Sequence, residues 1–153
     1  MLSASHVPKG WSPMSSVSVS AAALAELLEL VARKIHSMGH ADDLFPAQWM
    51  ALRYFARAQM NMRTASELAR FQGMALGPVT RTVRKLVEKG LLRKSAEQPR
   101  GRAEWLELTE LGWTLLKVDP LQALEEAVAG LPEGNKLSLA VALETIIRQL
   151  SDR

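Results

Sequence analysis

Residues 77–90 read GPVTRTVRKLVEKG, and their spacing predicts a short helix with one apolar face and one basic face. Val79, Val83 and Leu86 follow the i, i+4, i+7 spacing of a single helix face. The remaining surface carries Thr80, Arg81, Arg84, Lys85 and Glu88. Pro78 suits a first helical turn, and Gly90 suits the residue just after a helix end. We therefore expect a helix over residues 78–89 whose apolar face packs against the rest of the protein and whose basic face points to solvent.

The charge of the chain is concentrated around this helix. The whole sequence carries a net charge of +3, but residues 77–102 contain eight Lys and Arg against two Asp and Glu. Residues 103–153 contain four Lys and Arg against nine Asp and Glu. Such a local excess of positive charge indicates an anionic partner, and a polyanion fits best. The alternative is a solvated basic face with no partner.

Composition places the chain among ordinary globular proteins. It has 153 residues, of which 48% are hydrophobic and 23% are charged, typical of a single domain with a real core. The absence of cysteine excludes disulfides and thiolate metal sites. No apolar run approaches the roughly 20 residues that cross a bilayer, and the first fifteen residues lack a secretory signal. We expect a cytoplasmic protein that does not contact membranes.

The flanks of the basic helix predict a winged helix-turn-helix. Thr64 and Glu67 have the spacing of a capping box, so we expect a helix from Thr64 to about residue 72 and a turn over residues 73–76. After the basic helix the hydrophobic period shifts toward two, which predicts strands over residues 91–95 and 104–108 with a basic tip between them. The expected fold is mainly α with a small β-hairpin wing.

The outer parts of the chain predict an arm and further helices. Residues 1–16 have the Ser, Pro and Gly content of a flexible arm. Residues 17–39 form an apolar helix, and so much apolar circumference suggests burial against a partner subunit. We expect a helix from Pro46 to about residue 60. Beyond residue 109 we expect helices that bend at Asp119-Pro120, and a last helix capped by Asn135.

Three strings together resemble the MarR family of bacterial transcriptional regulators. They are Thr-Ala-Ser-Glu-Leu-Ala at 64–69, Val-Thr-Arg-x-Val-x-x-Leu-x-x-x-Gly-Leu at 79–91, and Leu-Thr-x-x-Gly at 108–112. The resemblance covers residues 20–151. It implies a homodimer of winged helix-turn-helix subunits that binds pseudopalindromic double-stranded DNA, here expected to be a repressor, and that a small ligand often releases. By this resemblance, residues 17–45 and 113–153 form a helical dimerisation region and residues 46–112 the DNA-binding region.

The wing departs from the family pattern. Many relatives carry Asp-x-x-Asp-Arg-Arg at the tip, whereas this chain has Glu-Gln-Pro-Arg-Gly-Arg at residues 97–102. One acidic position has become arginine and one arginine has become glycine, so the tip is more cationic. The basic helix also begins with Leu76-Gly77-Pro78 in place of the common serine cap.

Nine side chains are predicted to contact DNA. Arginine reads guanine in the major groove through two acceptors, whereas lysine more often binds phosphates. We assign major-groove base contacts to Arg81 and Arg84, and minor-groove contacts to Arg100 and Arg102 at the hairpin tip. Thr80 and Thr82 are predicted to contact phosphates or thymine methyl groups. The DNA backbone is predicted to be contacted by Lys85, Arg93 and Lys94.

The resemblance also implies a small-molecule site. Aromatic acids bind in relatives where the dimer helices meet the DNA-binding region, and four residues suit such a site here: His36, Trp49, Arg53 and Trp113. The alternative places Trp49 and Trp113 in the core and Arg53 on the surface.

Metal, cofactor and catalytic sites are not expected. His36, His40, Asp42 and Asp43 have ligand chemistry, but histidines near a helix end are more often simply exposed. No phosphate loop, nucleophile elbow or spaced carboxylate pair indicates an enzyme. Two other functions remain open, namely a winged-helix module that binds protein and a constitutive DNA-binding protein without an effector.

Overall fold

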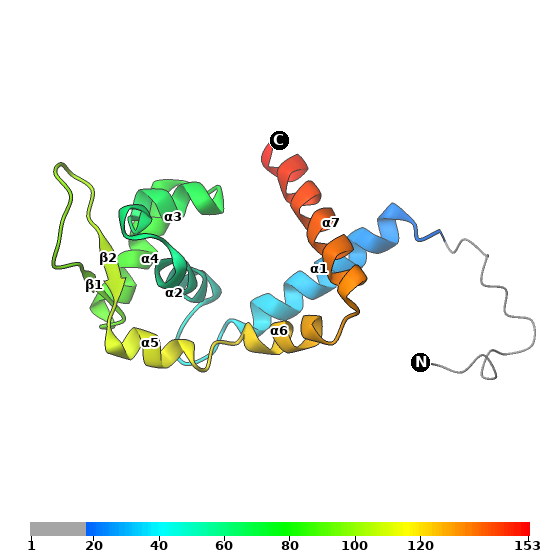
Figure 1. Cartoon of the computed structure of the whole chain (residues 1–153), viewed down its shortest axis with the longest axis horizontal. Helices are drawn as coiled ribbons and strands as arrows, with labels where there is room; N and C mark the ends of the chain where they lie inside the picture. Colours follow the sequence, from blue (N-terminus) through cyan, green and yellow to red (C-terminus); the bar gives the residue numbers. More distant parts are fainter. Residues whose placement is uncertain (1–17) are drawn as a thin grey trace, which may run out of the picture. The chain divides into compact units, whose positions relative to one another are not determined.

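The computed structural model describes residues 18–153. Their order of elements, shown in Figure 1, is α1 (Ala21–Met38), α2 (Pro46–Arg57), a 3-10 turn (Met60–Met62), α3 (Ala65–Gln72), α4 (Leu76–Glu88), β1 (Leu92–Lys94), β2 (Leu106–Leu108), α5 (Glu110–Leu116), α6 (Gln122–Ala129) and α7 (Glu133–Ser151). The predicted fold class, mainly α with a small hairpin wing, is confirmed. The predicted arm at residues 1–16 lies outside the described residues.

The chain divides into two units within α1, between Arg33 and Lys34. The part of α1 before this boundary is exposed along most of its length, and α1 as a whole has no buried residue. The second unit contains all the other helices and both strands.

One hydrophobic core joins α2, α3, α4, the hairpin and α5. Its largest fully buried side chains are Trp49, Leu52, Phe55, Leu68, Leu86 and Leu92. Val79, Val83 and Leu86 of α4 all point into this core, as their spacing predicts. Because the apolar face of α4 is held by α2 and α3, its opposite face is left to solvent.

The ends of α3 and α4 follow the local signals in the sequence. The Thr64 hydroxyl accepts a hydrogen bond of 3.1 Å from the Glu67 N–H, so Thr64 caps α3. Glu67 does not complete the capping box, because its carboxylate pairs with Arg70. Gly73 ends α3 with φ 62°, and Gly90 follows α4 with φ 73°, a conformation that favours glycine.

Helix α4 begins at Leu76, two residues before the predicted start. Pro78 still lies in the first turn, where a helix has no acceptor for its backbone N–H groups, so its missing N–H does not interrupt the helix. The helix predicted over residues 46–60 ends earlier, at Arg57, because Ala58 is extended with ψ 145°.

The hairpin is shorter than predicted. Leu92 pairs with Leu108 and Lys94 with Leu106, both in antiparallel register. One more backbone hydrogen bond follows, from the Ser95 N–H to the Trp105 carbonyl at 2.9 Å. The chain beyond this bond forms the wing tip without further strand pairing.

The Leu-Thr-x-x-Gly string has a packing role between the hairpin and α5. The Thr109 hydroxyl donates to the Gly90 carbonyl at 2.6 Å and accepts from the Gly112 N–H at 3.1 Å. A Cβ added at Gly112 would lie 2.4 Å from the Leu91 carbonyl oxygen. Glycine therefore allows α5 to approach the start of β1 closely.

The last helix begins before the predicted cap. Pro132 precedes α7 with φ −56°, and the N–H groups of Asn135 and Lys136 donate to its carbonyl at 3.0 and 3.1 Å. Asn135 thus lies inside the helix, and its prediction as the cap was wrong. None of the helices within residues 18–153 is long and apolar enough to span a membrane.

Candidate nucleic-acid interface

The outward face of α4 carries all five predicted contact residues of that helix. Arg81, Arg84 and Lys85 are exposed, and Thr80 and Thr82 are half-buried beside them. The Thr82 hydroxyl donates to the Pro78 carbonyl at 3.2 Å, a back-bond within the helix that takes up its proton. The available donors on this face are therefore chiefly those of the two arginines and Lys85.

The predicted cations differ in whether they already have a partner. Lys85 pairs with Glu88 at 3.0 Å, Arg93 with Glu107 at 2.9 Å, and Lys94 with Glu104 at 3.0 Å. All three pairs have an exposed cation, and exposed pairs contribute little to stability, so a phosphate can replace the carboxylate. Within the described residues, four predicted arginines make no ion pair: Arg81, Arg84, Arg100 and Arg102.

A hollow of about 430 Å³ lies between the start of α3, one side of α4 and the base of the wing. Thr80 and Arg84 line it from α4, and Lys94 and Arg102 line it from the hairpin. Residues from two separate elements are thus brought to one concave surface. Three cations, Arg84, Lys94 and Arg102, line it against one carboxylate, that of Glu104, so its net positive charge suits an acidic ligand.

A second hollow, of about 340 Å³, lies on the other flank of α4. Arg81, Thr82 and Lys85 line it from the helix, together with Lys89 and the start of α2. Helix α4 therefore presents cations on both of its flanks, the arrangement expected when a helix enters a groove between two phosphate backbones.

Sequence reasoning missed several side chains of these surfaces. Ser66 and Leu76 line the larger hollow, and Lys89 lines the smaller one while its ammonium donates to the Asp43 carbonyl. The helix start at Thr64 was a signal for Ser66, since unpaired N–H groups of a first turn attract phosphate. Nothing in the local sequence indicated Gln98, whose amide bonds the backbone across the wing.

The four residues predicted to bind a small ligand do not lie together. Arg53 and Trp113 line one hollow of about 260 Å³ with Arg57, Asp119 and other side chains. Trp49 is fully buried in the core, and its indole N–H has no hydrogen-bond partner. His36 lies on α1 and does not line this hollow. The alternative, in which both tryptophans are core residues and Arg53 is a surface residue, holds only for Trp49. Trp113 is 51% exposed, and Arg53 is held in a largely buried ion pair.

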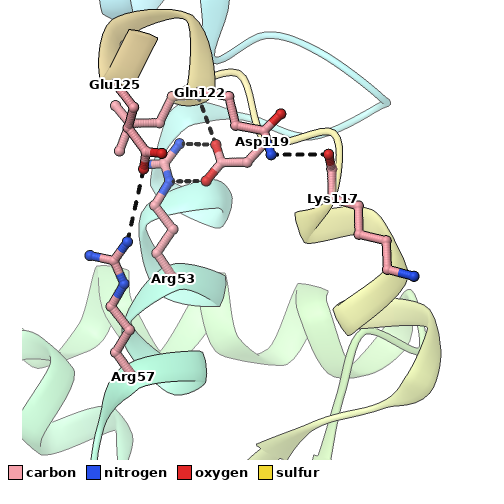
Figure 2. Close-up of polar contacts among 7 residues, drawn as sticks. Arg53, Arg57, Lys117, Asp119, Gln122 and Glu125 are labelled. Carbon is pink, nitrogen blue, oxygen red and sulfur yellow. Dashed lines mark hydrogen bonds and ion pairs between the residues drawn. The ribbon is translucent and has the colours of Figure 1, made fainter. Parts of the chain in front are cut away.

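Arg53 is held by Asp119 in a bidentate ion pair (Figure 2). Its Nε and Nη2 each donate to one carboxylate oxygen at 2.6 Å, and the side chains are 18% and 11% exposed. Asp119 also accepts from the Leu121 N–H at 2.9 Å. The pair therefore ties α2 to the junction between α5 and α6.

The pKa of Asp119 lies below its usual value. Burial raises the pKa of this carboxyl, but the hydrogen bonds from Arg53 and the Leu121 N–H outweigh it, with help from the charges of Arg53 and Arg57. Arg57 itself is exposed, with Nη2 4.0 Å from the Glu125 carboxylate in the same view (Figure 2). Asp119 is thus a charged structural partner, whereas Arg57 keeps most of its donors available.

The two histidines form part of an aromatic cluster. The rings of His36 and His40 are 5.2 Å apart between centroids, and His40 lies 5.6 Å from Phe45, both edge to face. Asp42 and Asp43 adopt φ values of 52° and 60° in the turn that follows. Among residues 18–153, no three potential metal ligands gather in one place.

Comparison with known proteins identifies this architecture. Residues 42–103 match the family model described as the MarR family. A Staphylococcus aureus MepR–DNA complex superposes with TM-score 0.68 at 18% identity, covering 87% of this chain and 99% of that one. A MarR/EmrR family regulator from Acinetobacter sp. ADP1 gives 0.67 at 19% identity, covering 85% and 96%. Staphylococcus aureus MarR in complex with salicylate and kanamycin gives 0.63 at 18% identity, covering 84% and 87%.

These findings define the winged-helix fold of MarR-family regulators. The solved structures share the fold, and the family match over residues 42–103 spans the helix-turn-helix and most of the wing. Residues 42–103 are similar to the MarR family, and the described residues have the fold of solved MarR-family regulators. A search of curated protein sequences found no match.

Proposed function

We propose that the protein is a homodimeric, sequence-specific repressor that occupies a pseudopalindromic operator in the cytoplasm. The observation that carries this proposal is the set of four arginines without ion pairs on α4 and the wing in the described structure, three of which line the hollows that flank the helix. Arg81 and Arg84 contact bases in the major groove, and Arg100 and Arg102 reach the adjacent minor groove. The solved complex of MepR with DNA supports the same use of this fold.

The outer helices support self-association. Neither α1 nor α7 has a buried residue, although both are rich in apolar side chains. The exposed ones include Leu24, Leu27, Leu30 and Val31 on α1, and Leu137, Val141, Ile147 and Leu150 on α7. So much exposed apolar surface on a small chain marks an interface. We assign residues 17–45 and 113–153 to dimerisation and residues 46–112 to DNA binding.

A two-fold dimer explains why the operator should be pseudopalindromic. Two copies of α4 related by a two-fold axis read the same half-site in opposite directions, about one helical turn apart. Occupation of such a site near a promoter blocks transcription, which is why we propose repression.

The DNA proposal is tested by selecting bound duplexes from a randomised pool with the full-length protein. We expect an enriched inverted repeat, and gel-shift binding to it that weakens steeply as salt rises, because phosphate contacts release counterions. Light scattering on the same sample should give a dimer. Failure to enrich any duplex would favour the alternative of a winged module that binds protein.

We further propose that a small aromatic acid releases the DNA from the hollow lined by Arg57 and Trp113. The Arg53 guanidinium is occupied by Asp119, so Arg57 is the arginine able to receive a ligand carboxylate. Trp113 is half-exposed on the same hollow and offers a face for a ring. The complex of Staphylococcus aureus MarR with salicylate supports this class of ligand.

The effector proposal is tested with salicylate as the probe. We expect it to quench tryptophan fluorescence and to release the selected duplex, with both effects reduced in Arg57→Ala and the quench lost in Trp113→Phe. Trp105→Phe on the wing serves as the matched control and should keep the quench. Binding of DNA unaffected by salicylate and by other aromatic acids would instead favour a constitutive DNA-binding protein.

A further inference from the structure

The wing tip extends well beyond its strands. Strand pairing ends with Lys94 opposite Leu106, and the last backbone hydrogen bond between the two arms joins Ser95 to Trp105. Residues 96–104 then form a loop of nine residues that carries Arg100 and Arg102. A loop of this length with no cross-connection samples many conformations, and each would place the arginines differently.

The side chain of Gln98 supplies such a cross-connection. Its amide nitrogen donates to the Ser95 carbonyl at 2.8 Å and to the Trp105 carbonyl at 2.9 Å. Its amide oxygen accepts from the Trp105 N–H at 2.9 Å. The Gln98 amide thus pairs with both backbone groups of Trp105, as an opposite strand residue would, and reaches the first arm as well.

We infer that Gln98 is a positioning residue for DNA binding, because its amide closes the wing loop and holds Arg100 and Arg102 where they can enter the minor groove. This inference rests on the proposed function of the wing arginines. It assigns the ordering of the tip to an uncharged side chain, since neither Arg100 nor Arg102 makes an ion pair in the described structure.

The residues that follow Gln98 restrict the tip further. Pro99 has a fixed φ, and Gly101 adopts φ 105°, which side chains other than glycine rarely accept. Arg100 and Arg102 flank this glycine, and Arg102 already lines the hollow beside α4. We call the three hydrogen bonds of the Gln98 amide the clip. Only five residues, 99–103, separate Gln98 from Glu104, whose carboxylate pairs with Lys94 at 3.0 Å. The arginines are therefore placed before DNA arrives, which lowers the entropy lost on binding.

Glutamine suits this position better than a charged residue. All three bonds involve backbone groups, two of them acceptors and one a donor, and an amide matches that set with two donor hydrogens and an acceptor oxygen. A carboxylate would keep the bond to the Trp105 N–H but would face two carbonyl oxygens. The clip therefore depends on the amide itself and not on polarity in general.

The test uses the full-length protein and the duplex selected from the random pool, with the bases outside the major-groove contacts varied. Three flanks are compared: A·T pairs, G·C pairs, and inosine·C pairs. Inosine lacks the guanine amino group, so an inosine·C pair resembles A·T in the minor groove and G·C in the major groove. If the wing arginines read the minor groove, wild type binds the A·T and inosine·C flanks about equally, and both about fivefold more tightly than G·C.

Gln98→Ala and Gln98→Glu should both reduce this flank preference to about twofold or less, while the preference at bases contacted by α4 is unchanged. Affinity for the A·T flank should fall about threefold to tenfold, since each of the three bonds contributes modestly. Gln59→Ala removes an exposed glutamine with no side-chain hydrogen bond in the described structure, and should leave every value unchanged. Thermal unfolding followed by circular dichroism should give similar midpoints for all variants, because Gln98 is exposed.

A double-mutant cycle separates positioning from general structural damage. If Gln98 acts through the wing arginines, Gln98→Ala adds no further loss once Arg100 and Arg102 are both alanine. The inference is overturned if wild type shows no flank preference, if Gln98→Ala keeps it, if all three flanks weaken equally, or if the losses add. Failure of wild type to bind any duplex would instead overturn the proposed function on which the inference rests.

Discussion

Arg53 and Arg81 carry the same guanidinium group in opposite settings. Arg53 is largely buried, and its Nε and Nη2 donate to the carboxylate of Asp119 at the junction of α5 and α6. Arg81 is exposed on α4, has no ion pair in the described structure, and lines a hollow on the outer surface. A buried arginine with its carboxylate fixes the fold, because separating the pair leaves a charge in a poorly solvated place. An exposed arginine without a partner leaves the fold unaffected and keeps its donors for a ligand.

The largest expected effect breaks the structural side of this comparison. Arg53→Ala should lower the free energy of unfolding by about 3 kcal/mol, the lower end of the cost of breaking a buried pair, because the carboxylate of Asp119 loses its counter-charge. Arg81→Ala should change it by about 0.5 kcal/mol or less. Urea denaturation followed by circular dichroism measures both. The double variant Arg53→Ala with Asp119→Ala should recover part of the loss, and equal stability of Arg53→Ala and wild type would contradict the assignment.

The next effect breaks the binding side. Arg81→Ala and Arg84→Ala should each weaken binding to the selected duplex by about 1 to 3 kcal/mol and relax preference at one base pair, because a bidentate contact with guanine is lost. Fluorescence anisotropy against duplexes with single substitutions at that pair measures the change. Equal weakening across all duplexes would show that these arginines bind phosphates instead.

The contrast between the two arginines also marks how far sequence reasoning reaches. Local patterns predicted the apolar face of α4, the Thr64 cap and the left-handed Gly90, because the causes of these features lie within a few residues. The Arg53–Asp119 pair joins residues 66 positions apart, and no local pattern indicates it. Trp49 and Trp113 differ in the same way, since one is fully buried and the other half-exposed through tertiary packing alone. No local pattern indicated a role for Gln98, because its partners on the opposite arm come within reach only once the hairpin has folded.

A smaller effect is expected for Lys85, a cation on the outward face of α4 that pairs with Glu88. Lys85→Ala should reduce the slope of log affinity against log salt by about one for each bound subunit, because lysine contributes one phosphate contact. Sequence preference should stay as in wild type. Gel-shift titrations across a series of salt concentrations measure the slope, with Lys136→Ala as a control whose ammonium pairs with Glu133 on α7. An unchanged slope would mean that Lys85 stays with Glu88 when DNA binds.

The smallest effect concerns acid stability at the Arg53–Asp119 pair. The pKa of Asp119 is lower in the folded protein than its usual value of 3.8, so the folded state favours the charged carboxylate. Its contribution to stability is complete above the unfolded pKa and is lost as pH falls through the folded pKa. Between neutral pH and pH values below 3.8, wild type should therefore lose more unfolding free energy than Asp119→Asn, which cannot titrate there. Urea denaturation of the two proteins across this range gives the difference. Parallel pH profiles of the two proteins would mean that Asp119 is not held as a charge by Arg53.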